Sequence, residues 1–243
     1  MAAQLFLMSS SRVAGGGYLE FARDALREFL GDCRTIYFAP FAIADYERYT
    51  SDVAAAFASF DVRIVGLHTV DDRSAVESAE VLFVGGGNSF RLLKRLHQLE
   101  LIEPVQRRVR SGALRYIGAS AGSNMACPSL RTTNDMPIVQ PPSFGAFDLL
   151  PFQINPHYIE PEVGSTHMGE TRETRLQEFL EENDVHVLGM REGAWLRRLG
   201  AQLMLGGVAG ARLFSRSAEP GELAPGTDLS WLLEATPHFD VET

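Results

Sequence analysis

Short apolar runs alternate along the first half of the chain with longer segments whose apolar residues recur at helical spacing. The apolar runs predict buried strands at 4–10, 34–41, 62–67, 80–87 and 113–120. The periodic segments predict helices at 18–30, 45–59, 89–99 and about 103–110. This alternation is typical of the α/β class, with a mostly parallel, doubly wound sheet covered by helices on both faces.

The alternation of apolar runs and helical segments becomes less regular after about residue 145. We expect a strand with its exit loop at 147–157 and a helix at 170–182. Short apolar runs between glycine turns then predict antiparallel strands at a sheet edge, over 185–190, 194–200, 201–207 and 211–216. Segment 217–230 is typical of a surface loop. Since no internal repeat or low-complexity linker interrupts the chain, we expect one domain over residues 1–243.

Composition and charge exclude several classes of protein. The net charge is −9 and no basic cluster occurs, so nucleic acid is not an expected partner. No apolar stretch approaches the length of a membrane span, and the first residues are typical of a strand rather than a signal peptide. Cys33 and Cys127 are too few for a disulfide scaffold and are expected to fill the core. We therefore expect a cytoplasmic protein with reduced thiols.

Chemically active residue types follow three of the predicted strands. Ser120 lies in a Gly-x-Ser-x-Gly segment at 118–122, a glycine run ending at Gly87 follows the fourth strand, and Ser9 follows the first. In open α/β sheets, ligands bind beyond the carboxyl ends of the strands. If these strands are neighbours, at least the serine and the glycine run come together there.

Each motif has a functional and a plain structural interpretation. Ser120 is a nucleophile exposed at a sharp strand-to-helix turn, or a residue that only caps the following helix. The glycine run fits no common nucleotide-binding fingerprint. Its loop N–H, near Gly87, could form an oxyanion hole with the N–H of Ala121, or the run is a simple turn. The residue pattern leaves both alternatives open.

A serine nucleophile needs a histidine base and a carboxylate that orients it. His157, at a strand exit after Pro156, is the best placed of the six histidines, and His167 lies in a glycine-flanked loop. Asp135 and Glu192 are the candidate carboxylates, and spacing does not choose between them. No His, Cys or carboxylate spacing typical of metal ligands occurs, so no metal site is expected.

Longer segments carry a more specific signal. The stretches "VGGGNSFRLLKRL" (84–96), "SAGSNMACPSLRTTNDMPIV" (120–139), "LLPFQINPH" (149–157), "GETRETRLQEFL" (169–180) and "GMREGAW" (189–195) closely resemble the peptidase E family of α-aspartyl dipeptidases. The resemblance implies a serine peptidase whose fold is similar to that of class I glutamine amidotransferases. It also implies release of N-terminal aspartate from Asp-X dipeptides, without a metal or cofactor.

The same resemblance implies roles for individual residues. Ser120 matches the family nucleophile and His157 its base. Both Asp135 and Glu192 match carboxylates described as the third member. We prefer Glu192, which follows a strand and could meet His157 at the sheet end, whereas Asp135 would position the substrate.

Substrate-binding candidates lie in the same matched segments. A substrate aspartate requires a cation, and Arg172 is preferred over Arg131. A free amine requires a carboxylate, which Asp135 or Glu170 could supply, and Asn88 follows the glycine run as a further candidate. The alternatives are a cyanophycinase-like peptidase that cuts β-aspartyl linkages, and a binding protein that keeps the fold without catalysis. The oligomeric state stays open, a homo-oligomer included.

Overall fold

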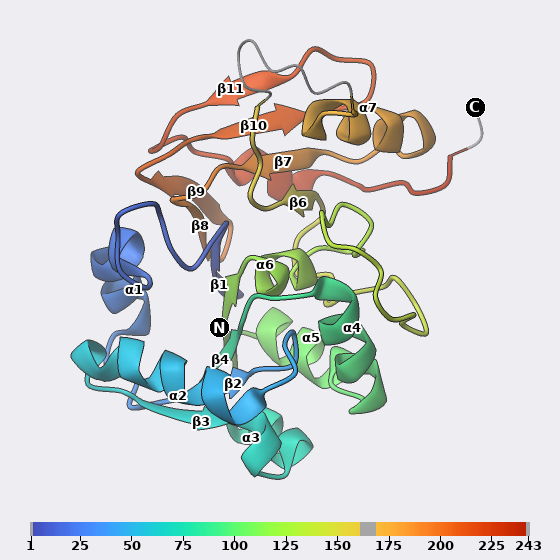
Figure 1. Cartoon of the computed structure of the whole chain (residues 1–243). Coiled ribbons are helices and arrows are strands. Elements are labelled where there is room, and N and C mark those ends of the chain that lie inside the picture. The colour runs from blue at the N-terminus through green and yellow to red at the C-terminus, as the bar shows by residue number, and fades with distance from the viewer. Residues whose placement is uncertain (1, 161–168, 242–243) are drawn as a thin grey trace.

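The computed structural model describes residues 2–160 and 169–241 (Figure 1). Its main element is a seven-stranded sheet with the strand order β3-β2-β4-β5-β1-β8-β9. The strands are β1 (Gln4–Met8), β2 (Thr35–Ala39), β3 (Arg63–Gly66), β4 (Val81–Val84), β5 (Arg115–Ala119), β8 (Ala194–Leu199) and β9 (Gln202–Gly207). Neighbours from β3 to β1 are parallel, and β8 and β9 add an antiparallel edge. The predicted α/β class, mostly parallel with antiparallel edge strands, is therefore confirmed.

Helices cover both faces of this sheet because its strands are apolar on both sides. In β1, Phe6 and Met8 pack in one cluster with α1 (Arg23–Leu30) and α2 (Tyr46–Phe57). Leu5 and Leu7 point to the opposite face and share a hydrophobic cluster with the helices that cover that face. These are α3 (Asp72–Ser78), α4 (Ser89–Gln98), α5 (Ile102–Arg110) and α6 (Ala121–Met125).

A second sheet of four strands lies above the main one in Figure 1, close to α6. Its order is β11-β10-β7-β6, from β6 (Gln153–Asn155), β7 (Val187–Met190), β10 (Ala211–Phe214) and β11 (Gly221–Leu223). The helix α7 (Arg172–Glu182) packs through Leu176 and Leu180 on Val187 and Phe214. Leu188 and Met190 instead join the core of the main sheet, so one continuous core reaches both sheets.

Several predicted elements are corrected by the structure. Segments 185–190 and 211–216 do not extend the edge of the main sheet, because β7 and β10 belong to the second sheet. The predicted loop 217–230 contains β11, a strand with no buried residue and hence no apolar signal. The helix predicted from residue 18 begins at Arg23, after a 3₁₀ turn and a left-handed Leu19 (φ 55°). The short α3 was not predicted, since it buries only Ala75 and Val76.

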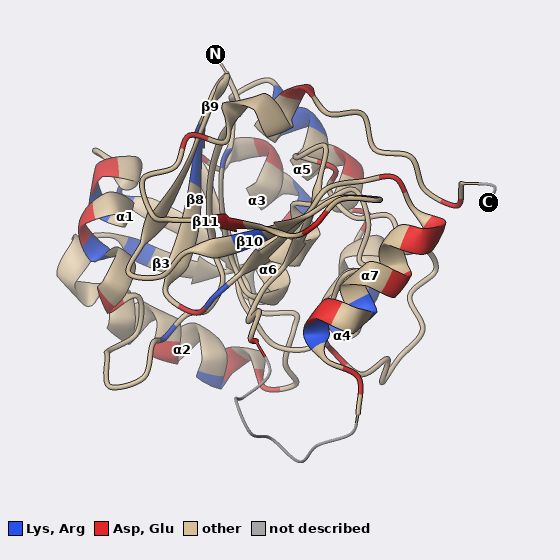
Figure 2. Cartoon of the chain, turned by 90° about the horizontal axis from the view of Figure 1, so that it is seen from above, with Lys and Arg blue, Asp and Glu red and all other residues tan. Residues whose placement is uncertain are grey.

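Short 3₁₀ helices lie at Glu20–Ala22, Ala58–Phe60, Leu67–Thr69 and Ser230–Glu234. Figure 2 shows acidic residues along α7 with basic residues interspersed toward one end. Over residues 2–160 and 169–241, we find no helix with both the length and the apolar content needed to cross a membrane.

Candidate active site

Ser120 occupies a strained turn between β5 and α6. Its backbone dihedrals are φ 54° and ψ −110°, a left-handed conformation that non-glycine residues rarely adopt. The Ser120 N–H donates to the carbonyl of Met8 at 2.9 Å, and its own carbonyl accepts from the N–H groups of Ser123 (2.9 Å) and Asn124 (3.1 Å). Bonds on both sides of the residue hold this conformation and fix the Ser120 side chain at the end of the sheet.

The glycines around Ser120 allow α6 to pack directly against the sheet. A Cβ atom on Gly122 would lie 2.0 Å from the carbonyl oxygen of Val84, and one on Gly118 would lie 2.6 Å from the Gly122 oxygen. Neither position has room for a side chain. The Gly-x-Ser-x-Gly pattern therefore has a steric cause in this fold.

Two hydrogen bonds connect Ser120 with His157 and Glu192. His157 Nε2 lies 2.8 Å from Ser120 Oγ, and His157 Nδ1 lies 2.7 Å from Glu192 Oε1. Since an ionised carboxylate only accepts, Nδ1–H donates to Glu192 and Nε2 is left to accept from the serine hydroxyl. The structure thus brings together a hydroxyl, an oriented imidazole and a carboxylate.

The backbone around His157 is fixed by a buried serine. Ser9 Oγ accepts from the His157 N–H at 2.9 Å and donates to the carbonyl of Met190 at 2.8 Å. His157 itself has φ 53°, so it is also held in the left-handed region. Ser9 therefore joins the end of β1 to the loops after β6 and β7, which carry His157 and Glu192.

Asp135 has different partners. Its Oδ2 accepts from the Ser89 N–H at 2.7 Å and from Ser89 Oγ at 2.6 Å, at the start of α4. Of the two candidate carboxylates, Glu192 is the one that bonds to His157, while Asp135 forms another wall of the site.

The glycine run lies against Ser120. A Cβ on Gly86 would be 3.2 Å from Ser120 Cβ, and Gly87 has φ 127°, with Ala42 O only 2.7 Å from its ideal Cβ position. Within the described part of the chain, no acceptor bonds to the N–H of Gly87 or of Ala121, the first residue of α6. Both N–H groups predicted for an oxyanion hole are thus free of protein partners there.

A cavity of about 180 Å³ opens beside Ser120. It is smaller than the roughly 300–1,000 Å³ typical of pockets for drug-sized ligands, and it suits one amino-acid residue better than a peptide segment. Its lining residues are Ser89, Ser120, Asn124, Thr133, Asn134, Asp135, Pro156, His157 and Arg172.

Arg172 is the cation of this cavity. Burial lowers the pKa of its guanidinium, nearby Arg175 lowers it further, and Asp135 raises it. Its Nη1 is buried and has no hydrogen-bond partner among the described residues. A half-buried guanidinium whose buried Nη1 has no acceptor among the described residues is suited to bind an anionic ligand group.

Three substrate-binding candidates do not line the cavity. Arg131 donates from Nη1 to Asp240 at 2.6 Å and from Nη2 at 2.9 Å, so its charge is already paired at the far end of the chain. Glu170 pairs with Arg175 at 3.5 Å. Asn88 caps α4 by accepting from the Arg91 N–H and donates to the carbonyl of Met136. Among the predicted cations, the lining of the cavity therefore favours Arg172, and a substrate contact of the other three residues stays a prediction.

Other cavity residues were not predicted from the sequence: Ser89, Asn124, Thr133, Asn134 and Pro156. Asn124 could have been found, because it lies four residues after Ser120 and therefore on the same helix face. Ser89 is the first residue of α4, and the other three lie outside helices and strands, where no periodicity gives their direction. His167, the other loop histidine, lies outside the described residues.

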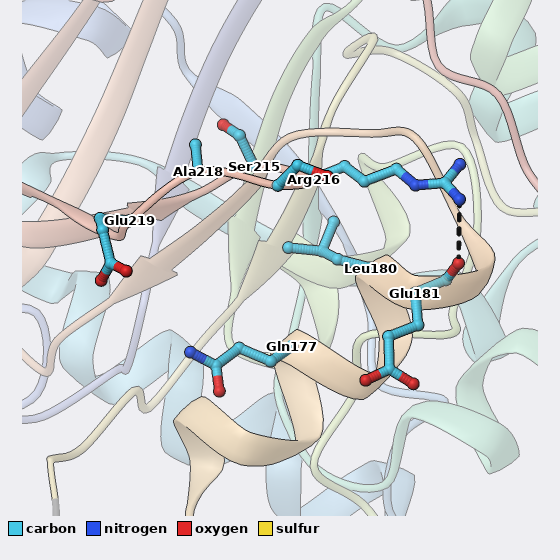
Figure 3. Close-up of a pocket in the computed structure, with 8 residues that line it drawn as sticks. Gln177, Leu180, Glu181, Ser215, Arg216, Ala218 and Glu219 are labelled. Atoms are coloured by element: carbon cyan, nitrogen blue, oxygen red, sulfur yellow. Dashed lines mark hydrogen bonds between the residues drawn. The ribbon is translucent and has the colours of Figure 1, made fainter.

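A larger hollow of about 590 Å³ lies between α7 and the loop after β10 (Figure 3). There Arg216 Nη2 donates to the carbonyl of Glu181 at 3.3 Å, beside Leu180. None of the site residues predicted from the sequence lines it, so size does not identify the site in this molecule.

Among the described side chains, no group of three His, Cys, Asp or Glu residues could hold a metal ion.

Comparison with known proteins identifies the family of this chain. The model of peptidase family S51 matches residues 5–206. The chain belongs to peptidase family S51. The resemblance found in the motifs is thereby confirmed, and the protein is a peptidase.

Family S51 relatives cover nearly the whole chain. Peptidase E of Streptomyces coelicolor is 55% identical over 98% of this chain and 98% of its own. A Drosophila melanogaster protein named probable alpha-aspartyl dipeptidase is 45% identical over 96% and 98%. The crystal structure of a peptidase from an acI-B1 Actinobacterium covers 94% of this chain and 97% of its own, with a TM-score of 0.67 at 15% identity, and it supports the fold alone.

Proposed function

We propose that this protein is a serine-type α-aspartyl dipeptidase that hydrolyses Asp-X dipeptides through an acyl-enzyme on Ser120. The observation that carries the proposal is the hydrogen-bonded set Ser120, His157 and Glu192, which lies beside a small cavity where Arg172 Nη1 has no partner among the described residues. The names of the relatives from Streptomyces coelicolor and Drosophila melanogaster support the same substrate class.

The first half of the reaction acylates the serine. His157 Nε2 accepts the proton of Ser120 as Oγ attacks the carbonyl carbon of the substrate aspartate. The carbonyl oxygen becomes an oxyanion, for which the free N–H groups of Gly87 and Ala121 are the candidate donors. His157 then gives its proton to the leaving amine, the C–N bond breaks, and residue X departs.

The second half returns the enzyme to its starting state. Water donates a proton to His157 and attacks the aspartyl ester, and His157 protonates Ser120 Oγ as free aspartate forms. Throughout the cycle Glu192 holds the imidazole by its Nδ1–H and stabilises the imidazolium that forms twice.

Specificity follows from opposite charges in the cavity. Arg172 offers a half-buried cation to the aspartate side chain, and Asp135 offers a carboxylate that attracts a positively charged amine. An N-terminal aspartate presents both complementary charges on one residue. The small cavity volume favours a single residue on the acyl side of the cleaved bond.

Two alternatives give different outcomes in one assay. Purified protein is incubated with α-Asp-Leu, β-Asp-Leu and Asn-Leu, and the release of leucine is measured. We expect α-Asp-Leu to be cleaved fastest, because only it places the scissile carbonyl on the main chain of an aspartate. Preference for β-Asp-Leu would favour a β-aspartyl peptidase. No hydrolysis, together with no fluorophosphonate labelling of Ser120, would favour a binding protein.

The role of Arg172 has a matched control. In Arg172→Met we expect kcat/KM for Asp-Leu to fall at least about tenfold relative to Asn-Leu, since an unpaired buried charge costs roughly 2–5 kcal/mol. Arg131→Met removes an arginine that pairs with Asp240 and should leave this ratio unchanged. An unchanged ratio in folded Arg172→Met would contradict the assignment.

We also propose a cytoplasmic location. The thiols of Cys33 and Cys127 are buried and free, which agrees with a reducing compartment.

A further inference from the structure

Asn124 has an amide oxygen that none of the described residues uses. The residue is 1% exposed, and its Nδ2 donates to the carbonyl of Ile154 at 2.7 Å. Its Oδ1 is buried and accepts no hydrogen bond from any described residue. Leaving a buried acceptor unpaired costs free energy, so such an atom is suited to meet a donor from outside the protein.

The orientation of this amide is fixed by its neighbour. If the amide were rotated by 180°, Oδ1 would face the carbonyl oxygen of Ile154, and two acceptors would oppose each other. Nδ2 is therefore the end bound to the protein, and Oδ1 is the free end. Asn124 also lines the cavity beside Ser120, one helical turn after it.

Few groups of an Asp-X dipeptide can donate to this oxygen. The side-chain carboxylate only accepts, and Arg172 provides its partner. The scissile carbonyl also accepts, and its oxygen turns to the N–H groups of Gly87 and Ala121. The scissile nitrogen must turn its lone pair to His157, from which the leaving amine receives its proton, and its N–H belongs to residue X on the leaving side of the bond. The α-ammonium, two bonds from the attacked carbon, is the remaining donor on the acyl side.

We infer that Asn124 is a substrate-binding residue whose Oδ1 accepts a hydrogen bond from the α-ammonium of the N-terminal residue. Asp135, on another wall of the same cavity, supplies the negative charge for that ammonium, and Asn124 supplies an oriented acceptor. The assignment rests on the proposed function and deepens it: it names the group by which the site distinguishes a free N-terminus from an acyl chain without an amine.

The test measures recognition of the ammonium without requiring turnover. L-aspartate and succinate differ only by the amine, and each should protect Ser120 from labelling by a small fluorophosphonate. In the wild type, succinate should require at least about ten times the concentration of L-aspartate for half protection, since hydrogen bonds to charged groups are worth roughly 1.5–3 kcal/mol. In Asn124→Leu, this succinate-to-aspartate ratio should fall about tenfold.

Asn155 provides a matched control. It is also a buried asparagine with an unpartnered Oδ1, and its Nδ2 donates to Thr132 and Asn134, but it does not line the cavity. Asn155→Leu should therefore keep the wild-type ratio, even if stability falls. The assignment is overturned if folded Asn124→Leu keeps the wild-type ratio, or if the wild type binds succinate as well as aspartate.

A second measurement does not depend on the folding of an Asn124 variant. In a crystal structure of Ser120→Ala with bound Asp-Leu, we expect the α-ammonium nitrogen at about 2.7–3.2 Å from Asn124 Oδ1. An ordered water on Oδ1, with the ammonium bound elsewhere, would overturn the inference. Failure of the wild type to cleave Asp-Leu would instead contradict the proposed function, so the two failures are distinguishable.

Discussion

The two sheets of this molecule contribute different parts of the site. The main sheet supplies Ser120 and the glycine run, which follow directly from β5 and β4. The second sheet supplies His157 and Glu192 from the loops after β6 and β7, and α7 on its outer face supplies Arg172. The proposed nucleophile thus belongs to one region, and its base, its carboxylate and its cation belong to the other.

This division separates the proposed nucleophile from its base and from the cation that faces the substrate. The main-sheet residues are held by contacts within one compact unit, where Gly122 lies against Val84 and Ser120 bonds to Met8. The second region reaches Ser120 through bonds between distant parts of the chain, and His157 is 37 positions from Ser120 and 35 from Glu192. A fold built in this way can vary its second region to change the substrate while it keeps the same nucleophile.

The largest expected effect comes from breaking the contact between the two regions. Ser120→Ala and His157→Ala should each lower kcat for Asp-Leu by several orders of magnitude, because members of a catalytic unit act together. Circular dichroism should show that both variants keep the fold. Fluorophosphonate should fail to label Ser120→Ala at this position and should label His157→Ala far more slowly than the wild type. Near-normal turnover in folded Ser120→Ala would end the serine-peptidase proposal.

Glu192 and Asp135 should affect different kinetic constants, because only Glu192 bonds to His157. Glu192→Gln should lower kcat on the order of 10³–10⁴-fold, because the amide no longer fixes the imidazole tautomer or stabilises the imidazolium. Asp135→Asn should act more on KM, since Asp135 bonds to Ser89 and faces the substrate cavity. Steady-state kinetics on Asp-Leu measures both. The reverse pattern would move Asp135 into the catalytic set.

Within the main sheet, the tight packing of α6 predicts a loss of stability. In Gly122→Ala the new methyl group would meet Val84 O at 2.0 Å, so we expect a loss of about 3 kcal/mol in the free energy of unfolding. For a chain of this size that corresponds to roughly 6–12 °C in Tm. Gly221→Ala is the control, because nothing lies within 4 Å of its Cβ position. Equal melting temperatures for the two variants would contradict the steric account.

The smallest effect concerns the anchoring of α7 on the second sheet. Arg212 Nη1 donates to Glu173 at 2.8 Å, next to Arg172 in the first turn of α7. Arg212→Met should reduce the preference for Asp-Leu over Asn-Leu by a few-fold and change kcat little, since partly exposed pairs are worth about 1 kcal/mol or less. Arg216→Met is the control, because Arg216 bonds to Glu181 toward the other end of the helix. An equal change in both variants would argue against a specific role for this anchor.

The parallel sheet could be predicted from the sequence because its strands are apolar on both faces. Each of the first five strands lies within its predicted segment, as β4 does within 80–87. The second sheet was not foreseen as a separate unit, since β6 and β11 have three residues each and local patterning does not tell which edge a short strand joins.

In the site, too, one part could be predicted from the sequence and another part could not. Position after a strand directed attention to Ser120 and favoured Glu192 over Asp135, whereas Arg172 was a candidate because it lies in a segment that matches the family. Arg131 and Arg172 carry the same chemistry in equally matched motifs. Only the tertiary structure shows that Asp240 pairs with Arg131, and that Arg172 is left unpaired among the described residues. Partners that are distant in sequence decide which of two equivalent side chains is available.

The Ser9 contact also leads to a prediction about when activity returns during refolding. Ser9 bonds to His157 and Met190, which are 148 and 181 positions away in the chain. Contacts of such long range form late, because the chain must close large loops before they add stability. During refolding from denaturant, the helical signal should therefore recover before hydrolysis does. The delay between the two signals would time the docking of the second sheet onto the first.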